Sequence, residues 1–299
     1  MTPSSCSVFL KNLKLYALLY WIGFLGLTLI IGCETNKEKL YTADEAERKF
    51  LQICKEEYDW EVTTKLVENT FWIYLPFERN ILQFEANRFS PETKCMVEYF
   101  KGYFIDKTFY FEYQITPLLK SERDKGYTTG FTEQASEEFQ YLINVIYRVY
   151  FNAQEQPEFY AIVLADIANG VEIIYKIYGE DLKKAYNNAI ASDDYSKRVV
   201  QEVKGGLEII QDKTGRHLDY HVITFDQFLV EQINQRVRFE LFDQGFKLCN
   251  APEEKILKII SYCLGTYEFR GFSKVILKNL SSGNKTEASR ETLGEIKEF

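Results

Sequence analysis

The chain has two histidines, His217 and His221, and a carboxylate, Asp219, stands between them. Side chains alternate between the two faces of a β-strand, so on a strand all three would share one face. Two imidazole nitrogens and a carboxylate oxygen are ligands that zinc accepts. Their alternation with Leu218 and Tyr220 is also typical of a half-exposed strand. We expect exposed histidines, with a metal site as the weaker alternative because no fourth ligand is evident.

Asp166 is a single carboxylate in the otherwise apolar segment 159–168. Burial raises the pKa of a carboxyl group, which can then act as a general acid or base. Together with Glu180 or Asp181, Asp166 could form the pair of acids that a hydrolase uses. The simpler expectation is that Asp166 hydrogen-bonds a neighbouring loop. Glu180 and Asp181 then begin a helix, where acids interact favourably with the N-terminus.

Other catalytic signatures are absent from the sequence. It contains no G-x-S-x-G, H-E-x-x-H, P-loop or G-x-G-x-x-G pattern. A net charge of −8 argues against nucleic-acid binding, which needs a basic face. We therefore expect no cofactor and no catalytic residues, and a binding or structural module. The carboxylate hydrolase with Asp166 is the alternative.

The N-terminal segment has the order of charges that an export signal needs. Lys11 and Lys14 form a short basic region, and an uncharged apolar run follows over residues 15–32. A basic segment followed by an apolar one is typical of a secretory signal peptide. The chain turns polar abruptly after Cys33.

The end of this run, Leu29-Ile30-Ile31-Gly32-Cys33, resembles the lipobox of bacterial lipoproteins. The resemblance implies cleavage after Gly32, a signal peptide over 1–32, and a lipid on the thiol of Cys33. Residues 33–41 would be a tether, and the lipid would hold the body outside the cytoplasm in a bacterial cell envelope, within reach of an envelope protein partner. The alternative is an uncleaved transmembrane anchor with a palmitoylated or unmodified Cys33.

Four cysteines remain in the body, and they allow three disulfide pairings. No two of them have the C-x-x-C spacing that zinc sites favour. Cys54 and Cys263 lie on apolar faces of predicted helices, where a free thiol acts as a small hydrophobe. The pairing of Cys54, Cys95, Cys249 and Cys263 therefore stays open, as does the oligomeric state.

The elements that must position these side chains follow from hydrophobic periodicity. Of the 299 residues 46% are hydrophobic and 16% aromatic, which indicates a folded, strand-rich body over 42–280. Capping boxes at 42–45 and 224–227 predict two helix starts. The predicted helices cover 43–59, 132–152, 180–204 with a break near 192–194, 225–245 and 252–265. The predicted strands cover 62–67, 71–75, 95–105, 108–115, 159–168, 171–178, 207–211, 217–223 and 272–280.

Strands joined by short turns predict an α+β fold, with an antiparallel sheet built from hairpins and amphipathic helices packed on it. Asn169-Gly170 suits a two-residue type I′ turn, which would place Asp166 opposite Ile173. The helix over 132–152 carries the longest apolar stripe, and we expect it to be the central core element. Residues 120–130 are a polar loop and a possible domain boundary, and 281–299 a frayed polar tail.

Overall fold

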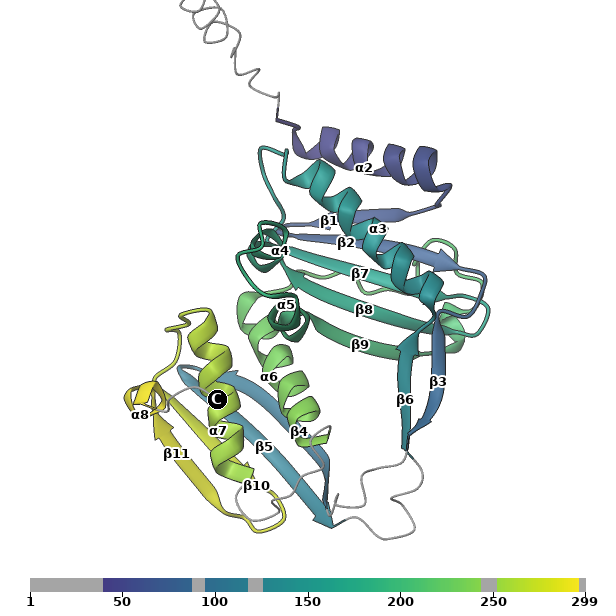
Figure 1. Cartoon of the computed structure of the whole chain (residues 1–299). Coiled ribbons are helices and arrows are strands. Elements are labelled where there is room, and N and C mark those ends of the chain that lie inside the picture. The colour runs from purple at the N-terminus through teal and green to yellow at the C-terminus, as the bar shows by residue number, and fades with distance from the viewer. Residues whose placement is uncertain (1–39, 88–94, 118–125, 243–251, 296–299) are drawn as a thin grey trace, which may run out of the picture. The chain divides into compact units, whose positions relative to one another are not determined.

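Three sheets organise the part of the chain that the structure, a computed structural model, describes: residues 40–87, 95–117, 126–242 and 252–295. Most strand pairs are antiparallel, and helices cover the sheets, which confirms the α+β class (Figure 1). The predicted signal over 1–32 and its lipobox lie outside the described residues, as do Cys249 and most of the predicted boundary at 120–130.

The largest sheet has five strands in the order β1-β2-β7-β8-β9. The predicted hairpins β1–β2 and β7–β8 are confirmed. β2 and β7 pair in parallel, and both are almost wholly buried because the sheet is covered on both faces. The strands are β1 (Thr63–Val67), β2 (Thr70–Phe77), β7 (Phe159–Asp166), β8 (Val171–Tyr178) and β9 (Val200–Gly205).

Two helices, α2 (Ala43–Tyr58) and α3 (Glu133–Tyr150), cover one face of this sheet (Figure 1). The predicted capping box of α2 forms, because Thr42 accepts from the Glu45 amide while the Glu45 side chain accepts from the Thr42 amide. The predicted stripe of α3 is confirmed as core, with three buried aliphatic side chains and a partly buried Phe139 packed against them. The buried members are Leu142, Ile143 and Ile146.

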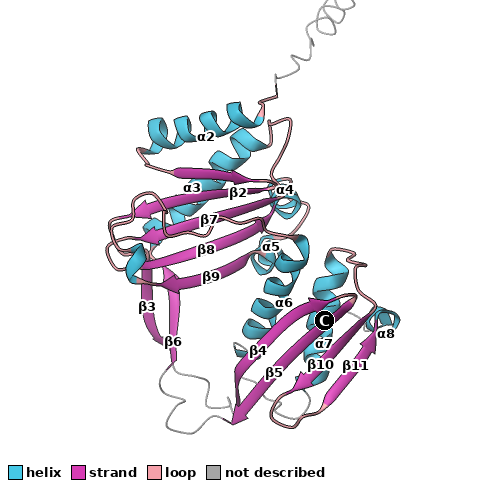
Figure 2. Ribbon diagram, turned by 180° about the vertical axis from the view of Figure 1, so that it is seen from behind, coloured by secondary structure: helices cyan, strands magenta, loops and turns pink. Residues whose placement is uncertain are grey.

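The second sheet has four strands in the order β11-β10-β5-β4, and β10 runs parallel to β5 (Figure 2). Its core includes buried residues of α6, α7, β5 and β10. Gly102 in β4 donates its amide to the side chain of Asn234 in α6, which ties the helix to the sheet edge. The elements are β4 (Cys95–Ile105), β5 (Thr108–Pro117), β10 (Lys274–Asn279), β11 (Lys285–Ser289), α6 (Phe225–Phe242), α7 (Pro252–Thr266) and α8 (Arg290–Glu295).

Several elements differ from the predictions. β3 (Leu82–Asn87) and β6 (Gly126–Phe131) pair with each other, whereas the sequence predicts no element over the first and a loop over most of the second. Their partners are distant in sequence, so no local pattern marks them. The predicted frayed tail contains β11 and α8, which are held by pairing with β10 and by the buried Leu293.

The region between β8 and α6 also differs. α4 (Gly179–Tyr186) and α5 (Ser192–Arg198) match the predicted broken helix, but residues 200–204 lie in β9 because the edge of β8 is available for pairing. The predicted hairpin 207–211/217–223 does not form. A 3₁₀ turn, η2 (Leu207–Ile209), and an irregular loop take its place, since this loop bonds to side chains of the five-stranded sheet.

The turn of the β7–β8 hairpin is longer than predicted. Asp166 pairs with Val171, not with Ile173, so four residues form the loop. Of the two predicted positive φ angles, only that of Gly170 is found, at 68°. A Cβ on Gly170 would lie 2.7 Å from the carbonyl oxygen of Gly206, which explains the glycine.

Candidate functional site

The predicted metal ligands His217, Asp219 and His221 do not converge. His217 Nδ1 lies 2.7 Å from Asp212 Oδ2, and its Nε2 lies 2.7 Å from Glu172 Oε2. Asp219 is exposed, and His221 Nδ1 contacts the Asp219 carbonyl oxygen at 2.8 Å. No group of three or more His, Cys, Asp or Glu side chains within the described ranges could hold a metal ion.

His217 is enclosed, not exposed as predicted, with 9% of its side chain accessible. An ionised carboxylate can only accept hydrogen bonds, so this arrangement favours the imidazole with a proton on both ring nitrogens. Burial alone would lower the pKa of His217, but the hydrogen bonds to Asp212 and Glu172 raise it above its ordinary value. The ring of His217 is thus held between two carboxylates that stabilise its protonated form.

This cluster fastens the loop 206–223 over the face of the five-stranded sheet opposite α3. Trp72 Nε1 donates to the His221 carbonyl oxygen at 2.9 Å, and Tyr74 Oη donates to the Asp212 carbonyl oxygen at 2.5 Å. Buried Thr70 accepts from the amide of Ile223 at 2.9 Å. The polar groups of His217 and Asp212 thus serve to hold the loop.

The predicted acid pair of a hydrolase is not assembled. Asp166 is buried and its carboxylate accepts from the amides of Ala168 and Asn169, as the simpler expectation had it. Asp166 lies at one end of the β7–β8 hairpin, while Glu180 and Asp181 follow the other end. The seven residues between Asp166 and that end span roughly 24 Å of strand. Glycosidase acids stand only about 5 to 9.5 Å apart.

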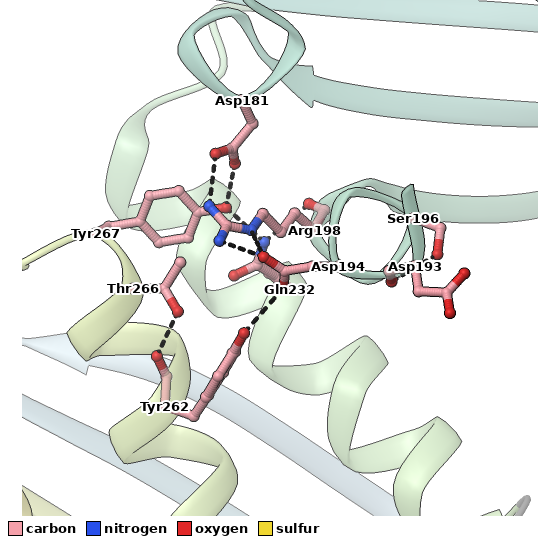
Figure 3. Close-up of polar contacts among 9 residues, drawn as sticks. All are labelled: Asp181, Asp193, Asp194, Ser196, Arg198, Gln232, Tyr262, Thr266 and Tyr267. Carbon is pink, nitrogen blue, oxygen red and sulfur yellow. Dashed lines mark hydrogen bonds and ion pairs between the residues drawn. The ribbon is translucent and has the colours of Figure 1, made fainter. Parts of the chain in front are cut away.

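Asp181 has a buried partner that the sequence did not indicate. Arg198, at the end of α5, donates from Nη1 to Asp181 Oδ1 at 2.9 Å and from Nη2 to Asp194 Oδ2 at 2.5 Å (Figure 3). The Asp181 side chain is 3% exposed and that of Arg198 11%. This guanidinium between two carboxylates joins α4 to α5.

The same cluster reaches α6 and α7 through neutral side chains (Figure 3). Tyr267 Oη donates to Asp181 Oδ2 at 2.5 Å, and Gln232 Nε2 donates to Tyr267 Oη at 2.8 Å. Tyr262 Oη donates to Asp194 Oδ1 at 2.9 Å. Burial, and then the charge of Asp181, raises the pKa of Tyr267, so its hydroxyl remains a donor. The cluster thereby links three helices, α4, α6 and α7, to α5.

A cleft of about 840 Å³ lies against α5. Its other walls are formed by residues of α3, of strands β8 and β9, and of α6. Aromatic rings of four elements contribute to its lining: Phe139 and Tyr147 of α3, Tyr175 of β8, Tyr195 of α5 and Phe239 of α6. Phe139 and Tyr175 are in contact, with ring centroids 4.5 Å apart. The polar lining residues include Gln140, Asn188, Ser192, Ser196, Lys197, Gln201, Gln235 and Arg236.

The polar side chains that line the cleft differ in whether they already have a partner within the protein. The buried hydroxyl of Tyr195 has no hydrogen-bond partner among the described residues. Gln235 bonds the edge of β9, since its Nε2 donates to the Val199 carbonyl oxygen and its Oε1 accepts from the Gln201 amide. Arg236 lies over the ring of Tyr262 at 4.1 Å. The cleft therefore combines aromatic rings with amides, hydroxyls, cations and the carboxylate of Glu240.

Sequence reasoning missed both the cluster and the cleft. The sequence places Arg198 only within the predicted helix over 180–204, and its pairing depends on α4 and α5 folding back on each other. One signal was present, because Gln232 falls within the apolar stripe of α6 and is only 1% exposed. A polar residue on a buried helix face needs partners.

Comparison with protein-family models, curated proteins and solved structures gave no match. Within the described ranges, no helix combines the length and the apolar character needed to cross a membrane.

Proposed function

We propose that this chain is a lipid-anchored binding module of a bacterial cell envelope that takes its ligand in the cleft beside α5 without transforming it. The observation that carries the binding role is the cleft. Its volume lies in the range of about 300–1,000 Å³ that is usual for ligand sites. Aromatic rings beside polar groups that can orient a ligand are found in such sites.

The cleft is supported by rigid surroundings, which favours binding. The Asp181–Arg198–Asp194 cluster fixes α5, the helix that contributes Tyr195, Ser196 and other residues to the lining. A wall held in place before the ligand arrives reduces the ordering cost of binding.

The anchoring part of the proposal rests on the lipobox ending at Cys33. Intact mass of the mature protein should begin at a Cys33 that carries lipid, and Cys33→Ala should release or misprocess the protein. Retention of residues 1–32 in the mature form would contradict lipidation and support the uncleaved anchor. This test is independent of the cleft.

The cleft can be tested with a small probe that matches its chemistry, N-acetylphenylalanine amide, which offers one aromatic ring and two amides. Saturation-transfer NMR of the full-length protein in lipid nanodiscs should show contact with the ring of the probe. Gln140→Trp, at the cleft, should abolish the signal, whereas Glu137→Trp, exposed on the same helix but outside the lining, should retain it. Equal signals from the two variants would contradict binding in this cleft.

A further inference from the structure

The edge of β9 adjoins the cleft, and its outward backbone groups are partly unpaired. β9 is the last strand of the five-stranded sheet. The amide of Gln201 points away from β8, because it donates to Gln235. Backbone groups alternate along an antiparallel strand, so those of Val203 and Gly205 point outward as well.

Gln235 shows how this edge binds a partner. Its side-chain amide donates to the carbonyl of Val199 at 2.7 Å and accepts from the amide of Gln201 at 2.5 Å. In parallel pairing, one residue of an added strand would make the same two bonds, donating its N–H to one carbonyl and accepting with its C=O from the amide two residues further along. The side chain of Gln235 thus occupies the first position along the edge.

The next positions along the edge are vacant within the described part of the chain. The carbonyls of Gln201 and Val203 and the amides of Val203 and Gly205 have no hydrogen-bond partner there. Val203 is 51% exposed, and Gly205 is exposed too. Alternating donors and acceptors at strand spacing are matched by the backbone of an extended peptide.

The side chains of such a peptide would meet the cleft. Gln201 lies opposite Tyr175 in the β8–β9 register, and both line the cleft. A strand added beside β9 would place every second side chain on this same face. The aromatic lining suits an aromatic or aliphatic side chain there.

We propose that the ligand of the cleft is an extended peptide segment that pairs with the edge of β9 at Gln201–Gly205 and inserts an apolar side chain between α3, β9 and α5. This inference rests on the proposed binding function and narrows it to one ligand class. Other exposed edges, such as that of β1, are not part of the cleft lining.

The probe is a capped peptide of alternating threonine and phenylalanine flanked by lysines, titrated into the full-length protein in nanodiscs. Val203→Pro removes one outward amide and leaves the β8–β9 bonds intact, since proline is tolerated where the N–H faces away from the sheet. Val203→Ala keeps the amide and is the matched control. We expect Val203→Pro to raise the dissociation constant of the peptide at least tenfold. Val203→Ala should change it less than threefold.

Two measurements leave the protein sequence untouched, in case Val203→Pro disturbs folding. Saturating peptide should slow hydrogen exchange of the Val203 and Gly205 amides at least tenfold. N-methylation of the peptide backbone should abolish binding at alternate positions, namely those whose N–H faces β9.

The inference is overturned by any of three results: no binding of the peptide, no protection of the Val203 and Gly205 amides, or equal affinity of all N-methylated peptides. A dimer that Val203→Pro dissociates would assign the edge to a second copy and also overturn it. If N-acetylphenylalanine amide still binds the cleft in any of these cases, the proposed function stands while the peptide assignment falls.

Discussion

The buried cluster around Arg198 should dominate the stability of the region beside the cleft, and Arg198→Met tests this. The substitution keeps the length and the apolar stem of the side chain but removes the charge. Asp181, with 3% of its side chain exposed, would keep its hydrogen bond from Tyr267 and lose its cation. Removing one partner of a buried ion pair costs about 3–5 kcal/mol. The lost ion pair with Asp194 contributes less to this cost than the pair with Asp181. The Asp194 side chain is 29% exposed, and exposed pairs contribute about 0–1 kcal/mol.

A double-mutant cycle separates the pair from the isolated charges. Asp181→Leu alone leaves Arg198 with Asp194 only, and we expect a loss of about 2–4 kcal/mol, somewhat below that of Arg198→Met. In Arg198→Met/Asp181→Leu neither buried charge remains, and replacing a buried ion pair by apolar side chains is often close to neutral. The double variant should therefore be at least ~2 kcal/mol more stable than the sum of the single losses implies.

Urea unfolding with linear extrapolation measures these differences in unfolding free energy. The comparison requires that the dependence of this free energy on urea concentration is the same in all variants. Lys55→Met is the matched control, because Lys55 and Asp59 form an ion pair with 57% and 89% of their side chains exposed. Its unfolding free energy should not differ measurably from that of wild type. A loss below about 1 kcal/mol for Arg198→Met would refute the reasoning, as would additive effects in the cycle.

Three further predictions concern the rest of the body. Folding raises the pKa of His217, so its stabilising contribution is complete below the ordinary pKa of about 6.5 and is lost as pH rises through the higher folded value; the stability gap between wild type and His217→Gln should narrow from pH 6 to 9, and a constant gap would contradict this. Ile143→Ala should lower the free energy of unfolding by about 2–5 kcal/mol, because the side chain is buried in the core, whereas an unchanged urea midpoint would place Ile143 on a docking face. Burial raises the pKa of Cys54 to about 12 and that of Cys263 to about 11, so both thiols should react with Ellman's reagent only on unfolding, and rapid reaction in native buffer would contradict their burial.

The elements that the sequence predicted are those with strong local signals. The capping box at Thr42 and Glu45 and the stripe of α3 required only neighbours within the same helix. The β7–β8 hairpin followed from its apolar runs and Gly170, although the loop proved two residues longer because Asp166 itself pairs with Val171.

The missed strands and strand pairings depend on partners far away in the chain. β2 pairs in parallel with β7, and β3 pairs with β6, so neither arrangement leaves a turn between consecutive strands. β9 was predicted as the end of a helix, since its polar residues give no alternation of buried and exposed positions beyond Val200. Pairing with β8 decides its conformation instead, in keeping with the strong context dependence of strand propensity.

The candidate site was missed for a related reason, and its residues show which signal a sequence can offer. Gln232 and Gln235 lie one turn apart on α6. The side-chain amides of both form hydrogen bonds with backbone groups of the segment 198–201. Residues of β8 show the same pattern, because buried Glu172 and Lys176 bond to His217 and Glu231. A polar residue in an apolar stripe is costly to bury without partners. Such positions predict that a second polar segment packs there, while the identity of that segment follows only from the fold.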